Sequence, residues 1–138
     1  MAAHRVGPRK VEPLQRLLLD SSFLIAVVEH PTRWREDLLE KIGKFEPVVI
    51  LPVYDELANL SAGRTRARRY AALAKELVDR GDFLLVEARG TRTADDELVS
   101  LALEGNAAVA TLDRELAAQL RAAHVPVVGL RKGRVSLV

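Results

Sequence analysis

The sequence predicts a three-layer α/β domain in which helices cover both faces of a parallel sheet. Apolar segments of strand length alternate with helical segments five times along the 138 residues. These segments are continuously apolar rather than alternating, which is typical of parallel strands buried on both faces. Apolar residues make up 49% of the chain and charged residues 29%, a balance that indicates a folded globular domain.

Proline and glycine residues divide the first half of the chain into its elements. An apolar strand leads into a helix that stops at Pro31, and the next helix ends at Gly43. A β-branched strand then ends at Pro52, which is well placed to open a short helix. The elements expected here are a strand over 16–20, helices over 21–30 and 34–42, a strand over 46–52 and a helix over 53–60.

Helical periodicity and a capping pattern define the second half. Apolar residues at helical spacing mark one long helix that ends at Gly81, and Thr93 precedes Asp96 by the three residues of a capping box. The expected elements are a helix over 65–80, a strand over 82–87, a helix over 93–105, a strand over 107–111, a helix over 113–124, a strand over 125–130 and an edge strand within 131–138.

The composition and charge exclude several classes of protein. Cysteine is absent, which excludes disulfides, thiol nucleophiles and Cys-ligated metal sites. No apolar run approaches the roughly 18 residues of a membrane span, and no secretory signal is visible, so we expect a cytoplasmic protein without a membrane partner. Residues 1–15 lack periodicity and are expected to form a basic N-terminal tail, followed by one domain over 16–138.

Carboxylates follow several of the predicted strands. Asp20 closes the first, Glu56 lies in the helix after the second, Asp95 and Asp96 open the helix after the third, and Asp113 follows the fourth. In a parallel α/β sheet these positions share the carboxyl edge, where ligands bind. Clustered carboxylates repel one another unless a cation joins them, and oxygen ligands favour Mg²⁺ or Mn²⁺ over zinc. The pattern therefore predicts a divalent-metal site.

Each of these acids also has a structural interpretation. Asp20 and Asp113 stand where helix N-caps are expected, and aspartate is favoured at that position. Asp96 fits the capping box begun by Thr93, and Glu56 fits an exposed helix position. Spacing alone leaves both interpretations open.

The segments that carry the acids resemble the PIN domain, a family of small metal-dependent ribonucleases. The matching sequences are LLLDSSFLI, VYDELANL, TADDELVSLALE and VATLDRELAAQL, and the resemblance covers nearly all of residues 16–131. It leans towards the archaeal and eukaryotic branch related to small-subunit ribosomal RNA processing nucleases, with VapC-type toxins as the neighbouring branch. The resemblance implies a five-stranded parallel sheet in the order 3-2-1-4-5 between helices.

The resemblance also implies roles for individual residues. The family's catalytic and metal-binding acids correspond to Asp20, Glu56, Asp96 and Asp113, with Asp96 preferred over Asp95. Four further residues are expected to support these acids, namely Ser22, Asp95, Thr111 and Glu115. Arginines near the same edge are expected to contact RNA phosphates, with a solvated charged face as the alternative: Arg64, Arg66, Arg68, Arg69, Arg89 and Arg92.

The implied activity is Mg²⁺- or Mn²⁺-dependent hydrolysis of RNA, which leaves 5′-phosphate and 3′-hydroxyl ends. The expected partner is RNA, in particular a ribosomal RNA precursor, and relatives of this kind often form homodimers. Two other roles stay open. One is a VapC-type toxin controlled by an antitoxin. The other is a non-catalytic RNA-binding module in ribosome assembly.

Overall fold

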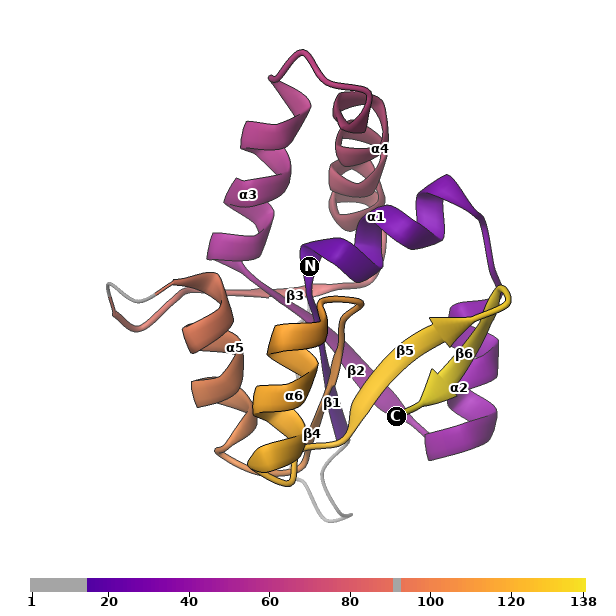
Figure 1. Ribbon diagram of the computed structural model, residues 1–138, viewed down its shortest axis with the longest axis vertical. Coiled ribbons are helices and arrows are strands. Elements are labelled where there is room, and N and C mark those ends of the chain that lie inside the picture. Colours follow the sequence, from indigo (N-terminus) through magenta and orange to yellow (C-terminus); the bar gives the residue numbers. More distant parts are fainter. Residues whose placement is uncertain (1–14, 91–92) are drawn as a thin grey trace.

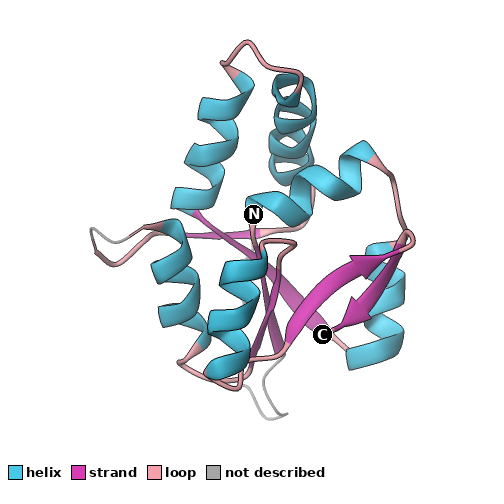
Figure 2. Cartoon of the chain, in the orientation of Figure 1, coloured by secondary structure: helices cyan, strands magenta, loops and turns pink. Residues whose placement is uncertain are grey.

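The described residues form one six-stranded sheet flanked by helices, as the computed structural model shows (Figures 1 and 2). The structure describes residues 15–90 and 93–138. The strands, in chain order, are β1 (Gln15–Leu19), β2 (Phe45–Ile50), β3 (Leu84–Val86), β4 (Ala107–Ala110), β5 (Val127–Arg131) and β6 (Arg134–Leu137). They lie in the order β3-β2-β1-β4-β5-β6.

The first five strands are parallel, so the predicted fold and the strand order 3-2-1-4-5 are confirmed. The sixth is a small addition that pairs antiparallel with β5 through a tight hairpin. Lys132 and Gly133 both adopt positive φ in this turn, the conformation that two-residue hairpin loops favour. The hairpin is the edge strand expected within 131–138.

Within the part of the chain that the structure describes, six helices connect and cover the strands. They are α1 (Ser21–Glu29), α2 (Trp34–Ile42), α3 (Leu51–Ser61), α4 (Ala67–Arg80), α5 (Ala94–Ala102) and α6 (Arg114–Ala122). In the described part of the chain, none of them is long and apolar enough to cross a membrane. The helix after β2 begins earlier than expected, because Leu51 already has helical geometry and Pro52 fits its first turn.

Several other boundaries differ from the expected ones, among them those at the tail and at one edge of the sheet. Gln15 belongs to β1 rather than to the tail, of which residues 1–14 lie outside the described part of the chain. The strand expected over 82–87 is reduced to the three residues of β3, which pairs only with β2 at the edge of the sheet. A very short edge strand limits the row of unpaired backbone groups that the border of a sheet presents.

The centre of the sheet is buried on both faces, as continuous apolar strands predict. Leu17, Leu18 and Leu19 follow one another in β1 and are all fully buried. Their neighbour β4 is built from alanine and valine, and small side chains there let the covering helices approach closely. β1 therefore lies in the middle of the sheet with β2 on one side and β4 on the other.

An aromatic cluster fixes the start of α2 against the rest of the domain. It contains all three phenylalanines and the single tryptophan of the chain. The Trp34 ring centroid lies 6.0 Å from that of Phe23, 6.4 Å from that of Phe45 and 6.2 Å from that of Phe83. The Arg35 guanidinium covers the Trp34 ring at 4.8 Å and the Phe83 ring at 4.9 Å, a cation–π contact.

An ion pair ties the β6 hairpin to α2. Arg134 donates through Nε to Asp37 Oδ2 at 2.9 Å and through Nη2 to Asp37 Oδ1 at 3.1 Å. This two-point contact, mainly through its hydrogen bonds, lowers the pKa of Asp37 below the usual range, although partial burial opposes the shift. The ionised form of Asp37 is therefore favoured more strongly in the folded chain than in the unfolded chain.

Asp37→Asn is expected to lower the melting temperature at neutral pH, because it removes the charge that Arg134 binds. The stability that a lowered carboxyl pKa supplies is present above the unfolded value of about 3.9 and is lost as the pH falls through the folded pKa. The difference between the two proteins should therefore shrink in acid. Thermal melts from about pH 3 to about pH 7 measure it. Asp55→Asn, at an exposed carboxyl, serves as control; an equal loss at every pH would contradict the prediction.

Candidate functional site

Asp20 is placed at the end of β1 by the sheet itself. Its backbone N–H donates to the carbonyl of Ala110 at 2.9 Å, which joins the ends of β1 and β4. Its side chain is 5% exposed, and Oδ2 accepts hydrogen bonds from Ser22 Oγ at 2.8 Å and from Thr111 Oγ1 at 2.7 Å. Three points of attachment therefore hold a buried carboxylate at the carboxyl edge of the sheet.

The two hydroxyl groups are themselves held by the backbone after β4. Leu112 donates its N–H to Ser22 Oγ at 2.9 Å, and Asp113 donates its N–H to Thr111 Oγ1 at 3.0 Å. Each hydroxyl thus accepts from the backbone and donates its one proton to Asp20. No described group donates a hydrogen bond to Asp20 Oδ1, so one oxygen is fixed and the other stays available.

Asp113 shows the same division between its two oxygens. Oδ1 accepts the N–H groups of Glu115 at 2.9 Å and of Leu116 at 3.1 Å, so Asp113 is the N-cap of α6. Within residues 15–90 and 93–138, no donor contacts its Oδ2. The structural interpretation of Asp113 is confirmed, and it does not compete with a ligand role because the two roles use different oxygens.

Glu56 is the third carboxylate of which one oxygen accepts a hydrogen bond from the chain. It lies on α3, and its Oε1 accepts from Ser21 Oγ at 3.0 Å. Ser21 is the first residue of α1, directly after Asp20, and is buried. Ser21 is not among the site residues predicted from the sequence, although a second small hydroxyl residue beside Asp20 could have indicated it. Figure 1 shows the first turns of α1, α3, α5 and α6 around the same end of the sheet.

Asp95 and Asp96 occupy different surroundings at the start of α5. Thr93 caps this helix by accepting the Asp96 N–H at 3.1 Å. Asp95 is partly buried, and its pKa is raised by burial first and then by the charges of four other acids, namely Asp20, Asp113, Glu56 and Asp96. Asp96 is exposed and borders a groove between α5 and α6. The electrostatics favour Asp95 as the inward-facing member, whereas the preference for Asp96 stays a prediction.

The chemistry of the donor set fits a hard divalent cation. Every side chain of the cluster offers carboxylate oxygens as metal ligands. In Asp20, Glu56 and Asp113, one of the two oxygens accepts no hydrogen bond from the described residues. As their side chains stand, no three Asp, Glu or His residues in the described ranges form a group that could hold an ion. The acids nevertheless lie close enough for the charges of Asp20, Glu56, Asp96 and Asp113 to act on Asp95.

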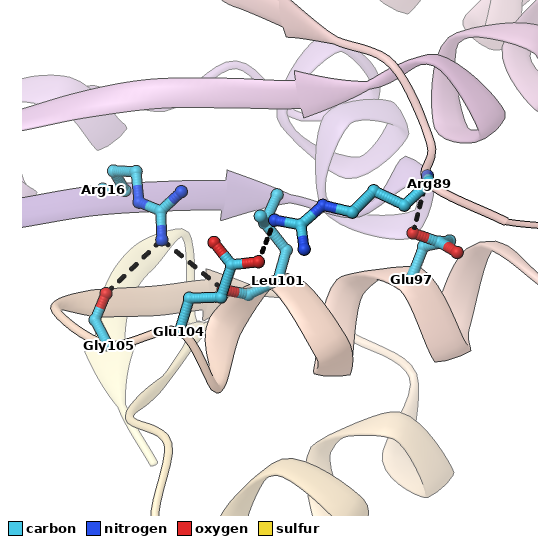
Figure 3. Close-up of polar contacts among 6 residues, drawn as sticks. All are labelled: Arg16, Arg89, Glu97, Leu101, Glu104 and Gly105. Carbon is cyan, nitrogen blue, oxygen red and sulfur yellow. Dashed lines mark hydrogen bonds and ion pairs between the residues drawn. The ribbon is translucent and has the colours of Figure 1, made fainter.

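Arginines expected to contact RNA fall into three groups. Arg64, Arg66, Arg68 and Arg69 are exposed at the connection between α3 and α4, which projects from the end of that helix pair away from the sheet (Figure 1). Arg89 forms an ion pair with Glu104, so its guanidinium already has a partner (Figure 3). Arg92 lies outside the described residues.

Three further hydrogen bonds secure α5 and the loop that precedes it (Figure 3). Glu97 is buried, and its Oε1 accepts the backbone N–H of Arg89 at 3.3 Å. Arg16 Nη2 donates to the carbonyls of Leu101 and Gly105, both at 3.4 Å, at the C-terminal end of the helix. These residues position the helix that carries Asp95. Glu115, in contrast, is exposed and contacts Asp113 through its backbone.

Comparison with known proteins gives the same fold and a related sequence. Residues 17–133 match the sequence family described as PIN like domain. The ribonuclease VapC4 of Methanocaldococcus jannaschii is 28% identical over 122 residues, which cover 86% of this chain and 92% of that protein. The structure of the PIN domain endonuclease Utp24 matches with a TM-score of 0.75 at 18% identity, and the match covers 88% of this chain and 90% of that one.

Asp95→Asn is expected to raise the melting temperature of the metal-free protein at neutral pH. A raised pKa means that the folded chain binds the Asp95 proton more tightly than the unfolded chain does, so the ionised carboxyl destabilises the fold. The gain should shrink as the pH falls through the raised folded pKa and vanish below the unfolded value of about 3.9, where both states are protonated. Thermal melts in EDTA, from about pH 3 to about pH 8, measure it.

Asp96→Asn is the matched control, since it removes the same charge one residue away. With Mn²⁺ added, the wild type and Asp96→Asn should both gain more stability than Asp95→Asn, because the ion binds the folded cluster. The reverse ranking would show that Asp96, not Asp95, faces the ion.

Asp113→Ala is expected to destabilise the protein by about 1 kcal/mol, because the N-cap of α6 is lost. Asp113→Asn should cost much less, since asparagine keeps an oxygen that can accept the Glu115 and Leu116 N–H groups. Urea denaturation of the metal-free proteins separates the two variants. Equal losses in both would mean that the charge, and not the cap, carries the stabilising role.

Proposed function

The chain belongs to the PIN-like domain family, and from this premise we propose that it is an endoribonuclease that uses Mg²⁺ or Mn²⁺ to hydrolyse RNA phosphodiester bonds. One observation carries the proposal. Asp20, Glu56 and Asp113 come from separate segments, and each is fixed through one carboxylate oxygen while the other is left without a described donor. Capping alone does not account for this set, because Asp20 makes no side-chain capping bond and Glu56 lies beyond the first turn of α3.

The proposed ion-binding residues are Asp20, Glu56, Asp95 and Asp113. Asp95 replaces Asp96 in this set because it is partly buried among the other acids, whereas Asp96 is exposed at the α5–α6 groove. A bound divalent ion would supply a water of lowered pKa and neutralise charge on the phosphate. Glu115 is left outside the set because its side chain has no described contact with the other acids.

The chain's own contribution is to hold its carboxylates in position before the substrate arrives. Ser22 and Thr111 fix the plane of the Asp20 carboxylate, and both are locked in turn by backbone N–H groups. Such supporting hydrogen bonds orient ligands and commonly change metal affinity or activity by roughly 10–100-fold when removed. Burial of Asp20 also limits competing water at its fixed oxygen.

Ribosomal RNA precursors remain the substrate that we propose, on the resemblance of the ADDELV and ATLDREL segments to the rRNA-processing branch. The match to a ribonuclease named VapC4 favours a second role, that of a VapC-type toxin held inactive by an antitoxin. A small neighbouring gene for a DNA-binding antitoxin would distinguish the two. A non-catalytic RNA-binding role is disfavoured because all the acids of the site are present.

Asp20→Asn is expected to reduce RNA cleavage by about 100-fold or more, because a charged ligand to the ion is lost while the shape of the side chain is kept. Asp113→Asn should act in the same direction and retain the α6 cap. The measurement is the rate of cleavage of a structured RNA in saturating Mn²⁺, with mapping of the product ends, which should carry 5′-phosphate and 3′-hydroxyl groups.

Two controls make the result interpretable. EDTA should abolish cleavage by the wild type, and circular dichroism should show that both variants are folded. Asp55→Asn removes a carboxylate from the same helix as Glu56 at an exposed position and should cleave normally. A folded Asp20→Asn protein with full activity would refute the proposed function.

A further inference from the structure

The connection between α3 and α4 carries a concentrated positive charge that the described part of the chain leaves unneutralised. Residues 57–75 include four arginines and one lysine but no acidic residue. Arg64, Arg66, Arg68 and Arg69 are all exposed, and within the described ranges none of them forms an ion pair or side-chain hydrogen bond. Elsewhere, Arg89 and Arg134 each pair with an acidic side chain.

Three of these arginines share one concave surface. Arg66, Arg68 and Arg69 line a depression of about 220 Å³ together with Thr65 and Tyr70. The depression combines guanidinium groups with a threonine and a tyrosine, which can donate hydroxyl protons. This combination suits a phosphate group, because arginine binds phosphate oxygens through paired hydrogen bonds. Like charges so close together repel one another, and a bound anion would relieve that repulsion.

The position of this surface relative to the acids is set by α3. Glu56 lies on this helix, five residues before its end at Ser61, and the arginines follow directly in the connection and in the first turn of α4. At about 1.5 Å per helical residue plus the connecting loop, the arginines lie roughly 10–15 Å beyond Glu56. A stacked RNA strand covers that distance in about three or four nucleotides, at ~3.4 Å each.

We propose that the arginines of the α3–α4 connection bind a backbone phosphate of the RNA substrate about three or four nucleotides from the scissile bond. The proposal rests on the proposed ribonuclease function and adds a second anchoring point to it. Arg64, Arg66, Arg68 and Arg69 act as substrate-positioning residues and not as catalytic residues. RNAs too short to reach both the acids and the arginines would therefore be poor substrates.

A scan of single neutral phosphates tests the proposal. The substrate is a short single-stranded RNA with one mapped cleavage site, and each variant RNA carries one methylphosphonate with a 2′-deoxy sugar at that nucleotide. The matched RNA has the 2′-deoxy sugar alone. Neutralising the anchored phosphate should weaken binding and lower kcat/KM by about two- to fivefold, the range expected for an exposed charge pair.

The protein variant is Arg66→Ala with Arg69→Ala. It should bind the unmodified RNA more weakly and show a salt slope reduced by about 0.7 per lost contact. It should also lose its sensitivity to the methylphosphonate at the anchored position while cleaving at the same bond. Arg64→Ala with Arg68→Ala is the second pair. Arg121→Ala with Arg131→Ala removes the same charge from exposed positions on other elements and should keep the wild-type pattern.

The possible outcomes separate this inference from the function on which it rests. If the wild type cleaves RNA but no phosphate three or four nucleotides away depends on the arginines, the inference is refuted and the nuclease function stands. If the control pair loses affinity and the position-specific effect equally, only net charge matters and the inference fails. If the wild type cleaves no RNA in Mn²⁺, the proposed function fails and the inference fails with it.

Discussion

The rest of the site depends on the parallel pairing of β1 with β4 and on the hydrogen bond that continues it at their carboxyl ends. The parallel pairing of these two strands places the Asp20 N–H on the Ala110 carbonyl, and the next residue, Thr111, then reaches the Asp20 carboxylate. In the backbone directly after β4, the Leu112 N–H donates to Ser22 Oγ, and the next residue, Asp113, lies at the start of α6. A change of register between β1 and β4 would separate these groups at once, because each contact continues the ladder of the sheet.

The cluster balances local structure against electrostatic repulsion. Helix starts favour negative side chains, and hydroxyl and backbone donors stabilise one oxygen of Asp20, Glu56 and Asp113. Asp95 has no such contact among the described residues. Its pKa is raised by its burial and by the neighbouring negative charges. The fold thus keeps an unfavourable arrangement of negative charges that a bound cation would relieve.

The sequence was sufficient for the fold and for the segments of the site, but not for every side chain. Continuous apolar strands predicted a parallel sheet, and Leu17 to Leu19 are buried as expected. Capping patterns also identified Thr93 and Asp113 correctly. The preference for Asp96 over Asp95 came from the family resemblance alone, because adjacent positions in a first helical turn differ only in direction, which tertiary packing decides. The pairing of Arg89 with Glu104 could not be predicted either, because the two residues are 15 positions apart and only the folded structure brings them together.

The hairpin that ends the chain has a consequence for how this domain can meet other molecules. β6 covers the β5 side of the sheet and is only four residues long, while β3 on the opposite side is three residues long. Short outer strands present few free backbone groups, so neither border of the sheet is a good template for a strand from another chain. Recognition by strand addition is therefore disfavoured, and partners are left with the helical surfaces and loops. The same shortness protects a core rich in leucine and valine from edge-to-edge aggregation.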